Sequence, residues 1–235
     1  MEFNPSKCQL LQITSSSSKK PIPTSYSLHG QTLETADHAK YLGVVIGSTL
    51  KWIFHISRIT CNANRSLGFV RRNIKCKNPK IREAAYKSLV RPQLEFASSA
   101  WDPHCQGHIK QIEQVQRRAA RWTLNDYRPQ ASVSTMLSTL GWRPLQQRWA
   151  LTRMTLFYKI VNGFVIIPLS SNIVRPMRQS SRGHPLRYMQ VQATRDSYKY
   201  SFFPSQSYSG MRYHHALYSH RLLMPLGDRS RSGHI

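Results

Sequence analysis

Acidic side chains are scarce and scattered along this chain of 235 residues. Ten Asp and Glu residues stand against 34 Lys and Arg residues. Phosphoryl transfer commonly relies on divalent metal ions held by closely placed carboxylates. The sequence contains no Asp-Asp or Asp-x-Asp pair, and no two acids lie within two residues of each other. This distribution disfavours a complete metal-dependent polymerase or nuclease, so we expect no catalytic residues, no metal site and no cofactor.

The cysteines and histidines do not form a metal-binding pattern either. No C-x-x-C spacing occurs, and His214-His215 has no cysteine nearby at zinc-finger spacing. We interpret the four cysteines as reduced thiols of a nuclear or cytoplasmic protein. The sequence also has no signal peptide and no apolar run of membrane-spanning length, so we expect no membrane partner. We expect no small-molecule substrate either. The cysteines are Cys8, Cys61, Cys76 and Cys105.

Basic residues dominate the charge, which is formally +24 at pH 7. Such an excess favours a polyanionic partner, and nucleic acid is the leading one. Ribosomal, histone-like and membrane-surface proteins carry similar charge, so the balance alone does not choose among them. Two clusters are candidate nucleic-acid-binding residues: Arg71, Arg72 and Lys75, and Arg117, Arg118 and Arg121.

Each basic cluster also has a purely structural interpretation. The first cluster follows the end of a predicted helix, where cations complement the helix dipole. The second lies on a predicted helix in which Glu113 stands four residues before Arg117, a spacing that suits a stabilising ion pair. Phosphate contact is the alternative, because backbone recognition needs several clustered cations.

The pattern of apolar residues predicts a mainly α fold with a small β part. Residues 1–50 contain three short strand-like segments, which suggest an antiparallel edge: Cys8–Thr14, Ser25–His29 and Ala39–Ile46. From residue 52 the period becomes helical. Helices are predicted near residues 52–74, 79–100, 107–124 and 144–162, with a shorter one at 133–140.

Helix signals and apolar faces specify these helices further. Asn78 is the predicted N-cap of the second helix and Pro79 its first residue, while Pro92 must kink or split it because proline supplies no ladder donor. The predicted apolar face of the first helix is Ile56, Ile59, Ala63, Leu67 and Val70; that of the second is Ile81, Ala84, Ala85, Ser88 and Leu89; and that of the third is Ile109, Ile112, Val115, Ala119 and Trp122. We expect six side chains in particular to be buried: Ile59, Leu67, Leu89, Ile112, Val115 and Leu156.

Aromatic and histidine side chains offer both binding and packing roles. Trp101, Trp122, Trp142 and Trp149 fall on or beside apolar faces, which favours core packing over stacking on bases. His55 is better explained as a polar residue between strand and helix than as a ligand or base. After Gly163 the periodicity fades, which predicts a basic extended segment over 163–204 and disorder over 205–235.

Seven short segments along the chain resemble motifs of one protein family. They read FNPSKC at 3–8, YLGV at 41–44, HI at 55–56, LVRPQLEFASSAWDP at 89–103, QVQRRAARW at 114–122, LGW at 140–142 with Arg148 after it, and YKYSFFP at 198–204. In this order they resemble the region downstream of the catalytic motif in reverse transcriptases of non-LTR, LINE-type retrotransposons, particularly jockey-like elements. Any one segment is weak, whereas seven in order carry the resemblance over residues 2–204.

The resemblance implies the end of a right-hand polymerase. Residues 1–50 would be the last palm strands, and residues 51–162 the helical thumb that holds a template-primer duplex of RNA or DNA through its backbone. The strand at Tyr41, Leu42 and Gly43 would support the primer. The family's catalytic aspartates, including the F/Y-A-D-D pair, belong upstream, and no such motif occurs in this sequence. The implied function is that of a reverse transcriptase fragment without catalysis of its own.

Two other functions stay open at this point. One is a domesticated nucleic-acid-binding protein derived from the same helices, and the other is a basic ribosome-associated protein. The segment 205–235 adds a hypothesis about origin. Codons for Gln206–His215 can be chosen so that a shifted frame reads IVQWNALPP, which resembles the family's I-V-x-W-N-x-L-P continuation. An out-of-frame tail would explain why no periodicity is found there.

Overall fold

The computed structural model describes residues 4–13, 25–167, 194, 196–202 and 204. The chain divides into two compact units, residues 1–158 and residues 159–235. The first unit begins with short strands and continues with helices, so the fold is mainly α with a small β part. Most of the predicted basic segment over 163–204, and the whole tail over 205–235, lie outside the described residues.

The β part consists of three two-stranded sheets. After a short 3-10 helix, η1 (Pro5–Lys7), strand β1 (Gln9–Leu11) pairs in parallel with β4 (Glu34–Ala36), whereas β2 (Ser27–Leu28) and β3 (Gln31–Thr32) form an antiparallel hairpin. The expectation of a wholly antiparallel edge is therefore wrong. Parallel pairing needs a long crossover, and residues 12–33 supply one between β1 and β4.

The third sheet corrects the prediction of a single strand over Ala39–Ile46. Strand β5 (His38–Tyr41) ends at a tight turn and pairs antiparallel with β6 (Val44–Gly47). The turn residues Leu42 and Gly43 both have positive φ, +45° and +88°. Two such residues are what the common two-residue hairpin requires. The apolar run hides this turn in the sequence, because leucine is unusual at positive φ.

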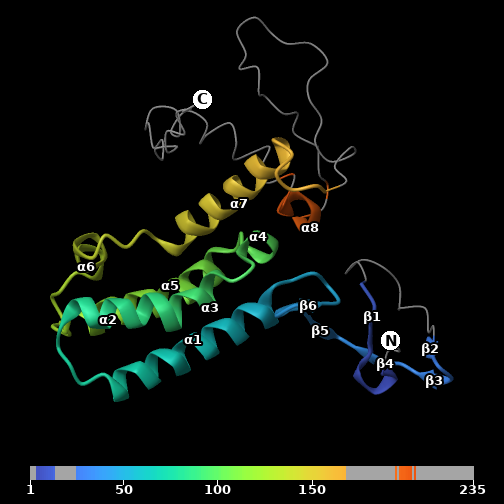
Figure 1. The fold of residues 1–235 in the computed structure, drawn as a ribbon, viewed down its shortest axis with the longest axis horizontal. Coiled ribbons are helices and arrows are strands. Elements are labelled where there is room, and N and C mark those ends of the chain that lie inside the picture. The colour runs from blue at the N-terminus through green and yellow to red at the C-terminus, as the bar shows by residue number, and fades with distance from the viewer. Residues whose placement is uncertain (1–3, 14–24, 168–193, 195, 203, 205–235) are drawn as a thin grey trace, which may run out of the picture. The chain divides into compact units, whose positions relative to one another are not determined.

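Two long helices follow the predicted periodicity. Helix α1 (Ile53–Asn73) leads away from the strands toward the turn before α2 (Figure 1), and α5 (Gln106–Leu124) packs against it. Both predicted faces are confirmed. The buried side chains are Ile56, Ile59, Ala63, Leu67 and Val70 in α1, and Ile109, Ile112, Val115, Ala119 and Trp122 in α5.

The helix predicted near 79–100 is broken into α2 (Pro79–Ala85), a π-helical turn η2 (Tyr86–Val90), α3 (Arg91–Glu95) and α4 (Ser98–Trp101). Its start is as predicted, because Asn78 caps it and Pro79 opens it. The predicted break at Pro92 takes the form of the π turn, in which the Arg91 N–H donates to the Tyr86 carbonyl five residues back. The absent N–H of Pro92 makes this wider turn the local solution.

The buried face of this helix lies one position away from the predicted one, beginning with Arg82 in α2. Ile81 and Leu89 are about half exposed (48% and 50%), so the prediction that they face the core is wrong. The core-facing residues repeat every four positions instead of every 3.6, because the widened turn adds a residue. They are Arg82, Tyr86, Val90 and Leu94.

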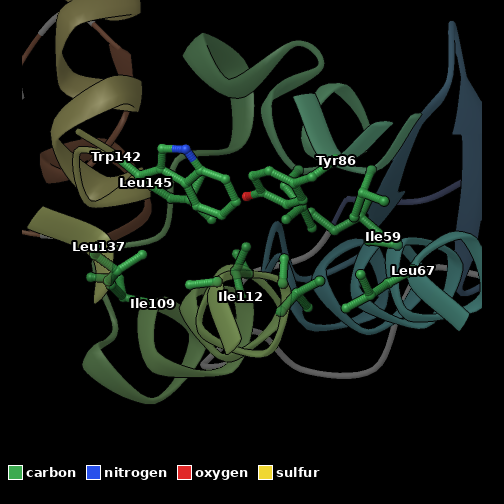
Figure 2. Close-up of a cluster of buried hydrophobic side chains, with 14 of the residues drawn as sticks. Ile59, Leu67, Tyr86, Ile109, Ile112, Leu137, Trp142 and Leu145 are labelled. Carbon is green, nitrogen blue, oxygen red and sulfur yellow. The ribbon is translucent and has the colours of Figure 1, made fainter. Parts of the chain in front are cut away.

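The core lies where α1, α5 and the α2–α3 segment meet. Tyr86 stacks on Trp142 with ring centroids 4.4 Å apart, and Figure 2 shows the two rings side by side near Leu145. The Tyr86 hydroxyl donates to the Gln116 Oε1 at 3.0 Å, which satisfies two buried polar groups together. All four tryptophans predicted to pack in the core are buried: Trp101, Trp122, Trp142 and Trp149.

Helix α6 (Val133–Thr139) and most of α7 (Leu145–Val161) complete the first unit. Helix α6 buries Val133, Met136 and Leu137, and α7 begins with buried Leu145 and Trp149. Of the six side chains singled out for burial, four are buried, Leu89 is exposed and Leu156 is half-buried. In the second unit, the described residues include α8 (Asp196–Lys199). Throughout the described ranges, each helix is too short or too polar to span a lipid bilayer.

Candidate nucleic-acid interface

The two predicted basic clusters are brought to one end of the first unit because α1 and α5 run in the same direction. Gln111 Nε2 donates to Thr60 Oγ1 at 3.2 Å, and further along both helices Arg118 Nη1 donates to Asn64 Oδ1 at 3.0 Å. These contacts advance along both helices together, so the two C-terminal ends are neighbours. Beyond the end of α5, the guanidinium of Arg71 lies over the Tyr127 ring, 5.9 Å from its centroid.

A buried arginine fastens these two helix ends to α2. Arg82 is 6% exposed, and its Nε donates to the Cys76 carbonyl at 2.8 Å, just beyond α1. Its Nη1 donates to the Trp122 carbonyl at 2.7 Å in the last turn of α5, and its guanidinium lies over the Trp122 ring. These donors satisfy the carbonyl of Cys76 in the loop after α1 and add a second donor to the Trp122 carbonyl, which also accepts from the Asn125 N–H. Arg82 is therefore a structural arginine, and it sets the spacing between the two clusters.

The end of α5 is itself tightly specified. Asn125 adopts the left-handed conformation, its N–H donates to the Trp122 carbonyl at 3.2 Å, and the Asp126 N–H donates to the Arg121 carbonyl at 3.1 Å. This is the hydrogen-bond pattern of a Schellman cap. Arg82 Nη1 also reaches the Asn125 side-chain oxygen at 3.2 Å. The chain leaving α5 is thus held in one conformation.

Six predicted residues line this region, which we call the basic end. Arg71, Arg72, Lys75 and Arg118 are exposed, while Arg117 and Arg121 are half-buried. None belongs to the buried face of α1 or α5, so their charged groups are not part of the core. The basic end is defined as Arg71, Arg72, Lys75, Arg117, Arg118 and Arg121.

The acidic partner suggested for Arg117 is engaged elsewhere. Glu113 Oε2 accepts from the Leu145 N–H at 2.9 Å at the start of α7, and its Oε1 accepts from Gln116 Nε2 at 2.9 Å. A carboxylate at a helix N-terminus is stabilised by the free N–H groups and the dipole there. The expected Glu113–Arg117 ion pair is absent from the described part of the chain, which leaves the Arg117 charge without that partner.

The other acids of the first unit that form ion pairs do so with cations outside the basic end. Glu83 pairs with Lys87, Glu95 with Arg148 and Arg91, Asp102 with Arg153, and Asp126 with Arg128. Hydrogen bonds from Arg128, with a smaller contribution from the charge of Arg121, lower the pKa of Asp126 to about 2. Over the described residues, none of the ion pairs involves a residue of the basic end. Its positive charge therefore remains available to an external anion.

The turn of the β5–β6 hairpin forms a second candidate contact at the other end of α1. Tyr41 and Leu42 are exposed at 66% and 77%, so they are not packed in the core. Arg58 Nη2 donates to the Gly43 carbonyl at 2.7 Å. A Cβ at Gly43 would lie 2.9 Å from the Phe96 ring. These contacts from α1 and from the residue after α3 hold the turn while the Tyr41 and Leu42 side chains face solvent.

His55 is a buried structural contact between this hairpin and α1. Its Nδ1 accepts from the Val45 N–H at 3.2 Å, and its ring lies edge-on to Trp101 at 5.1 Å. Burial, and secondarily the nearby charge of Arg58, lower the His55 pKa to about 4. The imidazole is therefore neutral at pH 7 and accepts a hydrogen bond, as a polar residue at the strand-helix junction would.

Sequence patterns missed three residues that shape these surfaces. The burial of Arg82 was not predicted, because the predicted apolar face of α2 lies one position away from the observed buried face. Arg58 acts through a carbonyl fifteen residues earlier, and Tyr127 follows the end of α5 with no periodic signal. Only the spacing of four from Arg82 to Tyr86 could have indicated a shared face.

The comparisons with known proteins supply no counterpart for these surfaces. Comparison of the chain with protein-family models, with curated proteins and with solved structures gave no match. Among the described residues, no three His, Cys, Asp or Glu side chains are grouped so that they could hold a metal ion. The basic end and the hairpin turn are consequently interpreted from their own chemistry.

Proposed function

We propose that this chain binds the sugar-phosphate backbone of a nucleic-acid duplex through the basic end. The observation that carries the proposal is the meeting of two clusters, Arg71 with Arg72 and Arg118 with Arg121, at adjacent ends of parallel helices. A row of cations from two helices, outside every ion pair of the described residues, suits a phosphate backbone, whose charges are regularly spaced and independent of base sequence.

The resemblance to non-LTR retrotransposon reverse transcriptases supports the same proposal. In that family the corresponding helices would form the thumb, and the hairpin turn at Tyr41, Leu42 and Gly43 would support the primer. The long α1 separates the basic end from the hairpin, so both surfaces could contact one template-primer duplex at different points. The proposed protein is thus a reverse transcriptase fragment that binds nucleic acid and does not itself perform polymerisation.

Neutralisation of two arginines tests the basic end. Arg118→Gln together with Arg121→Gln should weaken binding of the full chain to a blunt duplex, measured by fluorescence anisotropy at several salt concentrations. The slope of log affinity against log salt should fall by about one unit for each phosphate that the variant no longer neutralises. The decrease in affinity should be equal for duplexes of unrelated sequence, since interactions with the backbone carry no base information.

A matched control removes the same charge elsewhere. Lys51 and Lys87 are exposed and lie outside the basic end, and Lys87 is already paired with Glu83. Lys51→Gln with Lys87→Gln should leave affinity and salt slope close to those of the unchanged protein. Equal decreases in affinity in both double variants would reduce the proposal to nonspecific charge attraction and overturn it. A decrease for one duplex sequence alone would favour the domesticated, sequence-reading alternative.

A further inference from the structure

Tyr127 is an exposed aromatic residue inside the basic end. Its side chain is 49% exposed, and among the described residues the contact recorded for its ring is the guanidinium of Arg71. Arg121 precedes it in the last turn of α5, and Arg128 follows it directly. An accessible ring with the Arg71 guanidinium over it differs from the four buried tryptophans, whose rings pack in the core.

Hydrogen bonds hold the backbone on both sides of Tyr127, although its ring is exposed. Asn125 is fixed in the left-handed conformation by the Schellman cap and by Arg82. On the other side, Asp126 accepts from the Arg128 backbone N–H at 3.2 Å and pairs with the Arg128 guanidinium at 2.8 Å. Hydrogen bonds therefore fix Asn125 and Asp126 before Tyr127 and Arg128 after it.

This arrangement has the chemistry of a base-stacking platform. Proteins that bind single-stranded nucleic acid combine cations that follow the backbone with aromatic side chains on which bases stack. A blunt duplex offers phosphates to the cations, but its bases are stacked on one another, which leaves an aromatic residue at the side without a partner. An unpaired base next to the duplex could instead lie on the exposed phenol ring of Tyr127.

We infer that the basic end takes a duplex with a single-stranded extension, and that Tyr127 stacks on an unpaired base beside the duplex. This inference rests on the proposed duplex binding and narrows its ligand class. Arg71 contributes a positive charge next to the stacked base, where it also reaches the neighbouring phosphate. The Schellman cap and the Asp126–Arg128 pair keep the ring in place before the ligand arrives, which lowers the entropic cost of binding.

Affinity for matched oligonucleotides tests the inference on the full chain. The probes are one labelled blunt duplex and the same duplex with a short unpaired extension at its 3′ or its 5′ end. The unchanged protein should bind one of the extended probes about tenfold more tightly than the blunt duplex, the gain expected from stacking of a single base. A 2-aminopurine in the extension should change its fluorescence on binding.

Three substitutions separate stacking from a structural role. Tyr127→Leu should abolish the preference for the extended probe while leaving affinity for the blunt duplex unchanged. Tyr127→Phe should retain the preference, because the ring is kept. Phe69→Leu is the matched control, since Phe69 is another exposed aromatic residue, on α1 outside the basic end, and its replacement should alter neither affinity.

The possible contrary results are distinct. Equal binding of blunt and extended probes by the unchanged protein would overturn the inference and leave duplex binding intact. A Tyr127→Leu variant whose affinity falls equally for both probes would assign Tyr127 to holding Arg71 in place, which also overturns it. Failure of the unchanged protein to show salt-dependent binding to the blunt duplex would instead contradict the proposed function itself.

Discussion

The two ends of α1 use basic side chains in different ways. At the end that meets the hairpin, Arg58 is occupied by the Gly43 carbonyl and His55 is held neutral by burial. At the other end, Arg82 is occupied by carbonyls, whereas Arg71 and Arg72 remain exposed and outside any ion pair of the described residues.

This difference shows that the position of a cation in the sequence does not reveal its role. Arg71 and Arg82 are separated by a short loop and one helical turn, yet one faces solvent and the other is 6% exposed. The deciding factor is whether the guanidinium is buried where it reaches backbone carbonyls of neighbouring segments, as Arg82 does at Cys76 and Trp122. Cations that meet carbonyls hold the fold together, and those that do not are available to a ligand.

Removal of Arg82 should have the largest effect on stability. Arg82→Met keeps much of the side-chain volume but leaves the Cys76 and Trp122 carbonyls without these donors. The free energy of unfolding, measured in urea at pH 7, should fall by about 3 kcal/mol, because the buried guanidinium makes three hydrogen bonds and a hydrogen bond of a charged group contributes about 1.5–3 kcal/mol. Arg71→Gln, at the same end, should change it by less than about 0.5 kcal/mol. Similar decreases in both variants would remove the distinction between structural and free arginines.

The pH dependence of stability should report on His55 at the opposite end. Its folded pKa of about 4 lies below its ordinary value of 6.5, so the unfolded chain takes up the proton first as the pH falls. The stabilising contribution is therefore complete above about pH 6.5 and is lost toward pH 4. Urea unfolding of the unchanged protein and of His55→Gln should differ progressively more from pH 4 to 7, by up to about 3 kcal/mol.

Asp102 provides an internal check on that measurement. Burial raises the pKa of Asp102 to about 6, against the opposing effect of Arg153, so deprotonation of this group reduces stability as the pH rises. Its effect has the opposite sign to that of His55 and persists in the His55→Gln variant. In the unchanged protein the two opposite effects nearly cancel from pH 4 to 6, whereas the variant, which keeps only the Asp102 effect, should become less stable over this range. A variant whose stability followed the same profile as that of the unchanged protein would contradict the role of His55.

The smallest expected effect concerns the hairpin turn. Gly43→Ala places a Cβ near Phe96 and forces alanine to a φ of +88°. The free energy of unfolding should fall by about 1 kcal/mol, mainly through the left-handed backbone. Phe96→Ala in the same chain should recover little, because the ring end can move aside. Gly107→Ala, where a Cβ would meet nothing within 4 Å, should cause no decrease; full recovery with Phe96→Ala would show that steric contact dominates.

Helical periodicity predicted the buried faces of some helices correctly and that of one helix, which begins at Pro79, incorrectly. The buried faces of α1 and α5 follow regular helical spacing, and Asn78 with Pro79 marks the start of α2. In the helix that follows, the buried face begins at Arg82, one position after Ile81, and the π segment at Tyr86–Val90 continues it at a spacing of four, so Ile81 and Leu89 were wrongly assigned to the core. A prediction based on 3.6 residues per turn assumes that each N–H donates to the carbonyl four residues back. It therefore does not predict the π turn, in which the Arg91 N–H donates to the Tyr86 carbonyl five residues back.

The sequence by itself determined the excess of positive charge, the two basic clusters, the principal helices and the burial of the four tryptophans. Only the tertiary structure decided that the clusters meet at one end, that Glu113 caps α7 instead of pairing with Arg117, and that Arg82 is structural. The physical reason is one of range. Helix periodicity and capping depend on residues a few positions apart, whereas the partner of a charge is chosen among groups that the packing of distant helices brings together.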